Sequence, residues 1–276
     1  MRTMTRTGAS SPASAESEHH LKSSGPDASQ KSESPLWFDW LANGFSLVVL
    51  AFLVLTAWLI PLHFDTWTPW DASRYGSGLF ENLTIVVLVV PIVFGFGAFY
   101  QSRGCLPHPI LSYWILAWSL ACFYFLGEEG SWGQTYFHWS TPSFISTVNR
   151  QHETNLHNMT SWLNQKPRAL VELFIIVAGF IIPAWRLLGR RRKIFRNDFL
   201  SRCEGWIYAP NALLAVGLLY VVTRIATELP QPLLQRMGQG ELRELVIAWF
   251  LAWYLVSYFV RLKRLPKRSS LVIGTR

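Results

Sequence analysis

The sequence predicts an all-α, polytopic membrane protein with about six transmembrane helices and a polar, re-entrant or interfacial segment between the third and the fourth. Three observations support this fold class. Of the 276 residues, 50% are hydrophobic and 15% are charged. In soluble domains, roughly a quarter of the residues are charged. The apolar residues form blocks of about 20, the length of a helix that crosses the hydrocarbon core. The basic residues gather in short stretches beside these blocks, as cytoplasmic loops do.

The chain divides into three parts. Residues 1–35 are rich in Ser and lack aromatic residues, so they cannot bury enough apolar surface to offset their ordering entropy. We expect a disordered cytoplasmic tail there. Residues 36–264 form the six-span domain, and residues 265–276 form a basic cytoplasmic tail.

The apolar blocks give the expected positions of the spans. They cover residues 41–60, 79–100, 110–127, 168–188, 206–228 and 242–260. The loop at residues 63–78 contains Trp67 and Trp70 on either side of a Thr-Pro pair, and we expect it to lie along the membrane interface. No internal repeat is evident, so an inverted-repeat transporter is not supported.

The distribution of basic residues predicts the orientation. Seven cations lie at or after the end of the fourth span and five follow the sixth: Arg186, Arg190, Arg191, Arg192, Lys193, Arg196 and Arg202, then Arg261, Lys263, Arg264, Lys267 and Arg268. The positive-inside rule places both groups and both termini in the cytoplasm. The net charge of +8 therefore reflects loops that contact lipid headgroups, and we expect no nucleic-acid partner. The segment 127–158 then faces the periplasm or exterior of a bacterial cytoplasmic (inner) membrane.

This segment begins with two adjacent carboxylates, Glu128 and Glu129, at the end of the third span. Neighbours on a helix point about 100° apart. Only one of the two can therefore face a centre shared with Ser131 and Gln134.

The second half of the segment starts at Thr141-Pro142, a pair typical of a helix start. A helix continuing from there would place Asn149, Glu153 and His157 on one face. Gln151, Asn155 and Asn158 would form the adjacent face. A Glu and a His one turn apart can ligate one metal ion or act as an acid/base pair.

These patterns define the candidate site. The predicted catalytic and metal-ligating residues are Glu128, Glu129, Glu153 and His157, and the predicted polar support consists of Gln134, Asn149, Gln151, Asn155 and Asn158. A mixed set of carboxylates and imidazole suits a divalent cation such as Zn²⁺, Mn²⁺ or Fe²⁺. The alternative is a polar scaffold, in which these side chains hydrogen-bond one another to fix the segment.

Other ionisable residues lie at the same ends of the predicted spans. They are Glu81, Glu172, Arg224, Glu228, Arg243 and Glu244. Arg224 and Glu228 are spaced for a local ion pair. Alternatively, Arg224 would be a bidentate anchor for a phosphate or carboxylate in an outward-facing polar cavity.

Three stretches carry a resemblance to known sequences: GEEGSWGQ at 127–134, Thr141-Pro142, and N-x-Q-x-ETNLHN at 149–158. Together they resemble the signature of a family of uncharacterised bacterial multipass membrane proteins. The resemblance covers this segment and the layout of the spans, although Gly130 stands where a bulkier apolar residue is expected. The family implies no established activity, so the resemblance supports a site and not a reaction.

The sequence leaves three functional hypotheses. The leading one is a metal-dependent or acid/base membrane hydrolase or transferase that acts on a lipid or lipid-linked substrate at the outer leaflet, with membrane lipids as partners. The second is a transporter or flippase of a polar or lipid-linked solute, which would need polar groups along the spans. The third is a non-catalytic assembly subunit. The sequence does not determine the oligomeric state.

Overall fold

The computed structural model describes residues 33–59, 79–149, 152–156, 159–188, 198–228 and 239–265. Its elements are helices, and the described residues contain no strand. Five helices are long and apolar enough to cross a membrane, namely Phe80–Ser102, Ile110–Glu129, Gln165–Leu187, Cys203–Glu228 and Gly240–Lys263. The all-α, polytopic membrane class is therefore confirmed. Of the two expected tails, 1–35 and 265–276, residues 1–32 and 266–276 lie outside the described residues, as does the expected interfacial loop at 63–78.

The helices follow the predicted spans in order. They are α1 (Leu36–Leu59), α3 (Leu79–Ser102), α4 (Ile110–Glu129), α7 (Ser161–Phe174) continued by the π-helix η5 (Ile175–Ile181) and α8 (Ile182–Leu187), α9 (Asp198–Ile207), α10 (Leu214–Glu228) and α12 (Gln239–Lys263). The fourth helix begins at Ser161 rather than 168 because a polar turn extends it beyond the apolar block. Pro210, which has no N–H to donate, separates α9 from α10.

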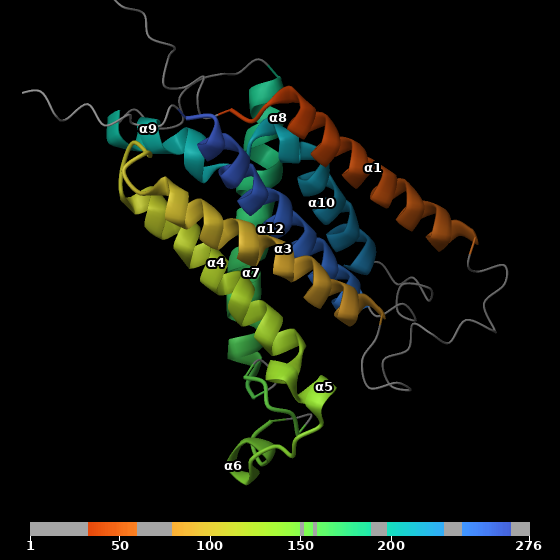
Figure 1. Cartoon of the computed structure of the whole chain (residues 1–276). Coiled ribbons are helices and arrows are strands. Elements are labelled where there is room, and N and C mark those ends of the chain that lie inside the picture. Colours follow the sequence, from red (N-terminus) through yellow and green to blue (C-terminus); the bar gives the residue numbers. More distant parts are fainter. Residues whose placement is uncertain are drawn as a thin grey trace, which may run out of the picture.

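Helix α12 occupies the middle of the helical bundle (Figure 1). It packs against α3, α4 and α10, and Phe250, Tyr254, Leu255 and Tyr258 on it are fully buried. Helix α1 packs against α10 at the edge of the bundle. The exposed side chains of α1, α3 and α4 are largely apolar, as expected for helices that face lipid.

The π-helix η5 passes very close to α10. A Cβ atom added at Gly217 would lie 2.5 Å from the carbonyl oxygen of Gly179, and one added at Gly179 would lie 2.4 Å from the ring of Phe250. Small residues allow such close backbone approach between membrane helices. The contact at Gly217 is with backbone, which cannot rotate away.

We therefore expect Gly217→Val to lower the free energy of unfolding by about 1–3 kcal/mol, the usual cost of overpacking. The matched control is Gly44→Ala in α1, where an added Cβ meets nothing within 4 Å. That change should leave stability equal or slightly higher, because Ala favours a helix over Gly. Thermal unfolding in detergent measures both. Equal midpoints for Gly217→Val and the wild type would contradict the close approach.

The charged residues of the described helices lie at the helix ends. The stretches 82–102, 110–127, 173–185, 205–223 and 245–260 contain no Asp, Glu, Lys or Arg. We call one end the acidic end, defined by Glu81, Glu129, Glu172, Glu228, Glu241 and Glu244. We call the other the basic end, defined by Arg103, Arg186, Arg261, Lys263 and Arg264. The polar residues between α4 and α7 lie at the acidic end (Figure 1).

Candidate functional site

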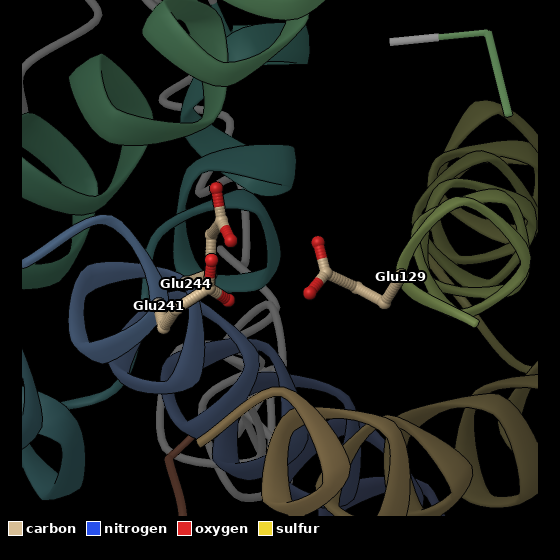
Figure 2. A group of neighbouring side chains, drawn as sticks. All are labelled: Glu129, Glu241 and Glu244. Carbon is tan, nitrogen blue, oxygen red and sulfur yellow. The ribbon is translucent and has the colours of Figure 1, made fainter. Parts of the chain in front are cut away.

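The last turn of α4 directs its two carboxylates to different places. Glu128, only 3% exposed, accepts hydrogen bonds from Trp132 Nε1 at 2.8 Å and from the Leu156 N–H at 2.7 Å. Glu129 instead points toward Glu241 and Glu244 on α12 (Figure 2). The prediction that the two carboxylates diverge is confirmed. Glu128 serves the segment that follows α4, and Glu129 belongs to a separate group.

We call residues 130–149 and 152–156 the polar segment. Its helical elements are short: η4 (Ser131–Gly133), α5 (Gln134–Phe137) and α6 (Ser143–Ser146). Most of its backbone therefore lacks regular hydrogen bonding, and side chains take over that role.

Glu153 lies at the centre of one set of hydrogen bonds in the polar segment. Its Oε2 accepts from Ser131 Oγ at 2.8 Å and from Asn155 Nδ2 at 2.7 Å. Asn149 Nδ2 donates to Asn155 Oδ1 at 2.8 Å, and Asn149 Oδ1 accepts the N–H of Glu153 at 3.2 Å. Ser131, Asn149 and Asn155 are almost completely buried. The side chains of Ser131, Asn149, Glu153 and Asn155 are thus linked by hydrogen bonds to one another.

Gln134 joins the two halves of the polar segment. Its Oε1 accepts the N–H of Thr154 at 2.6 Å, and its Nε2 donates to Thr141 Oγ1 at 2.7 Å and to the Trp139 carbonyl at 3.0 Å. Thr141 Oγ1 in turn donates to the His152 carbonyl at 2.6 Å. Both the oxygen and the nitrogen of the Gln134 carboxamide therefore form hydrogen bonds that hold the segment together.

The helix predicted from Thr141 through His157 is wrong for the described residues. Helix α6 ends at Ser146, and His152 has a positive φ of 59°. Asn149 Oδ1 accepts the Glu153 N–H that the Asn149 carbonyl would accept in a helix, which shows an Asn side chain competing with the backbone. Asn149 and Glu153 therefore do not share a helix face.

The described part of the predicted site thus has the pattern of a polar scaffold. Glu128 and Glu153 are held by donors of the segment itself. Gln134 and Asn149 bond backbone groups of the segment, and Asn155 bonds the side chains of Ser131, Asn149 and Glu153. Gln151, His157 and Asn158 lie outside the described residues, so their assigned roles stay predictions.

A second polar group forms where α4 meets α12. Glu129, Glu241 and Glu244 each offer a carboxylate oxygen, and these oxygens lie within 4.8 Å of one another. Figure 2 shows Glu129 from α4 facing Glu241 and Glu244 from the first turns of α12. We call these three residues the carboxylate triad. Carboxylates this close repel one another unless a proton or cation lies among them.

Guanidinium groups connect the triad to Glu172 on α7. Arg168 Nη1 lies 2.7 Å from Glu244 Oε1, and Arg168 Nε lies 3.1 Å from Glu172 Oε1. Glu172 also faces Arg243 Nε at 3.4 Å and Arg224 Nε at 3.8 Å. The Glu172 carboxylate therefore forms ion pairs with three guanidinium groups, one each from α7, α10 and α12. This network ties the acidic ends of three helices together, α7, α10 and α12.

Arg224 additionally forms an ion pair with Glu228, one turn later on α10, as its spacing predicted. The network together with the triad contains five carboxylates (Glu129, Glu172, Glu228, Glu241 and Glu244) and three guanidiniums (Arg168, Arg224 and Arg243). These eight residues are therefore acidic in sum. That balance favours a cation over an anion as a further occupant.

Sequence reasoning missed Glu241 and the linking role of Arg168. Glu241 and Glu244 are spaced i, i+3 at the start of α12, a local signal for one helix face. Glu129 lies far from them in sequence, and no local pattern relates residues so far apart.

The structure also connects α5 to α3, because Tyr136 Oη donates to Asn82 Oδ1 at 2.9 Å. Burial, reinforced by the negative charge of Glu81, raises the pKa of Tyr136, which keeps its hydroxyl a donor.

Related proteins would test whether the segment 127–158 carries a family signature. They would also show whether the polar segment or the carboxylate triad is shared. Comparison with protein-family models, with curated proteins and with solved structures gives no match for this chain, so the resemblance stays a prediction and the function has to be inferred from the geometry of the site.

Proposed function

We propose that this chain is a membrane enzyme that acts on a lipid or lipid-linked substrate, with a divalent cation held by Glu129, Glu241 and Glu244. The observation that carries the proposal is the carboxylate triad, because three carboxylate oxygens from two different helices converge within 4.8 Å. An all-oxygen donor set favours Mg²⁺ or Mn²⁺. Of the predicted catalytic and metal-ligating residues Glu128, Glu129, Glu153 and His157, the proposal keeps Glu129 and adds Glu241 and Glu244.

The groups beside the triad suit an anionic substrate headgroup. A bound cation polarises a phosphoryl or carbonyl oxygen and activates water. Arg243 Nε forms no hydrogen bond among the described residues, although it lies 3.4 Å from Glu172. Arg224 is 34% exposed. Arg224 can therefore donate to a phosphate or carboxylate while Glu172 and Glu228 hold it in place. The buried Arg243 Nε faces Glu172 instead.

The surface next to the network suits an apolar tail. Leu170 and Leu173 on α7, close in sequence to Arg168 and Glu172, are exposed, and so is Ile225 beside Arg224 on α10. A substrate lying in the leaflet could pack its chains on these residues while its polar head reaches the acidic end. This arrangement supports a lipid or lipid-linked substrate over a water-soluble one.

The proposed orientation places the acidic end at the outer face of a bacterial cytoplasmic membrane and both termini in the cytoplasm. The clustering of Arg186, Arg261, Lys263 and Arg264 at the opposite end supports it. A transporter is a weaker alternative, because the described spans contain no Asp, Glu, Lys or Arg between their ends. A non-catalytic assembly subunit remains the third hypothesis, with the polar segment docking a partner.

Elemental analysis and Mn²⁺ titration of the purified full chain test the proposal. Purification must avoid a metal-affinity step. We expect near-stoichiometric divalent cation in the wild type. Glu129→Gln, Glu241→Gln and Glu244→Gln should each weaken Mn²⁺ binding by about 100-fold or more, because even an indirect partner of a metal costs 10–100-fold. Loss of binding should also abolish turnover of extracted membrane lipids.

Two control variants make the test specific. Glu228→Gln changes a 63% exposed carboxylate at the same end, and Glu153→Gln changes one inside the polar segment. Both should keep the cation. A wild-type protein that is folded but binds neither Mn²⁺ nor Mg²⁺ at millimolar concentration would contradict the proposed centre. Cation loss in Glu153→Gln but not in Glu129→Gln would return the site to the polar segment.

A further inference from the structure

The stretch Ser131–Asn149 within the polar segment contains no Asp, Glu, Lys or Arg. Even so, it lies beyond the ends of the spans α4 and α7 (Figure 1). Its most exposed large side chains are apolar or aromatic, namely Tyr136, Phe137, Trp139, Phe144 and Val148. A segment that faces water normally carries charged residues on its surface. This stretch has the opposite composition.

Its interior is polar, while its exposed residues are mainly aromatic or apolar, with His138, Ser140, Ser143 and Thr147 also at the surface. The buried side chains Ser131 and Asn149, with Asn155 and Glu153, hydrogen-bond one another. Phe137 is 78% exposed and Phe144 is 72% exposed. Phe137 stacks on Trp139 with ring centroids 6.0 Å apart, which makes a flat aromatic surface. Backbone and polar groups satisfied internally, with apolar groups outside, is the arrangement that a lipid environment requires.

This apolar surface continues from the exposed side of α4. The ring of Trp132 contacts Phe123 at 6.1 Å and Tyr124 at 6.2 Å between centroids. Phe123 and Tyr124 are themselves exposed, as is Leu120 one turn earlier. Because α4 has the length and composition of a membrane span, its exposed side faces lipid. The same lipid then reaches the aromatic residues that follow Trp132.

We propose that Tyr136, Phe137, Trp139 and Phe144 insert into the headgroup layer and upper acyl chains of the leaflet at the acidic end. The occupant of this surface is the bilayer itself. Trp and Tyr prefer this layer because their rings are apolar and their tips are polar. The stretch has no cation to attract anionic headgroups, so insertion needs only neutral lipid. The inference does not depend on the proposed enzymatic function.

Spin-label accessibility in bilayer nanodiscs tests the insertion with the full chain. Cys105 is exposed, whereas Cys122 and Cys203 are buried, so Cys105→Ser gives a background without exposed thiols among the described cysteines. Nitroxides are attached at Phe137→Cys and at Phe144→Cys in phosphatidylcholine. We expect collisions with oxygen to outnumber collisions with a water-soluble nickel chelate, as at the lipid-facing reference Leu120→Cys. Labelled Cys105 in the wild type provides the aqueous reference.

The opposite result overturns the proposal. If the nickel chelate dominates at both positions, the aromatic surface faces water, and a protein partner becomes its occupant. Phe144→Cys suffices if Phe137→Cys disturbs the stacking with Trp139, because Phe144 is largely exposed. Adding phosphatidylglycerol or salt should leave the accessibilities unchanged. Insertion that occurs only with the anionic lipid would also overturn the proposal.

Discussion

Replacement of Glu172 by glutamine is expected to lower the free energy of unfolding by about 2–4 kcal/mol. Glu172 lies 3.1–3.8 Å from the guanidinium nitrogens of Arg168, Arg243 and Arg224, and its side chain is only 14% exposed. Glutamine keeps the shape but removes the charge that holds three cations together. Removing one partner from a buried ion pair costs about 3–5 kcal/mol, and partial exposure of the arginines reduces that figure.

Unfolding of the purified protein in mixed micelles by increasing SDS measures the change. Glu228→Gln is the matched control, because Glu228 also pairs with Arg224 but is largely exposed. Surface pairs contribute about 0–1 kcal/mol, so that variant should stay close to the wild type. Equal stability of Glu172→Gln and Glu228→Gln would show that the three guanidiniums do not depend on Glu172.

Replacement of Glu128 by glutamine is expected to release the end of the polar segment from α4. Each oxygen of Glu128 accepts one N–H, from Trp132 and from Leu156. The amide nitrogen of glutamine cannot accept a hydrogen bond, so one buried donor loses its partner. Hydrogen bonds to charged groups contribute about 1.5–3 kcal/mol each. We expect a local loss of about 2 kcal/mol, within this range.

Hydrogen exchange of the Leu156 amide, followed by mass spectrometry of peptides from the full chain, gives the direct readout. Protection there should fall roughly 30-fold, the equivalent of about 2 kcal/mol, because the amide then opens more often. Glu129→Gln is the control, since Glu129 points to α12 and should leave this amide protected. If Glu128→Gln abolished lipid turnover without changing exchange at Leu156, Glu128 would be catalytic rather than structural.

The helices were predictable because each span is a contiguous block of apolar residues whose length is set by the membrane. The ends of α3, α4 and α12 lie within a few residues of the expected ones. Differences arise where polar residues continue a helix beyond the apolar block, as in Ser161–Lys166, or where a proline divides a span, as at Pro210. The π-helix at Ile175–Ile181 was not predictable, because no hydropathy pattern distinguishes it from an α-helix.

The site was predictable only in its location and in the polar character of its residues. The divergence of Glu128 and Glu129 follows from helix geometry and is confirmed. The prediction of a helix after Thr141 was wrong. Backbone groups that would bond one another in a helix instead bond the side chains of Gln134, Asn149 and Thr141. The longest of these links, from the Thr154 N–H to Gln134, joins residues 20 positions apart. The carboxylate triad depends on α4 meeting α12, a pairing of distant helices that residue spacing within one segment does not reveal.

The central place of α12 has a consequence for how the protein is made. It leaves the ribosome after the other described spans, yet it is the most buried of them, with 67% of its most apolar stretch inside the bundle. Until it arrives, Arg168 lacks Glu244 and Glu172 lacks Arg243. The nascent chain must therefore keep the charged turn of α7 in contact with water or headgroups until α12 is in place. A ribosome that stops before residue 239 would leave an open groove for chaperones and membrane proteases to recognise.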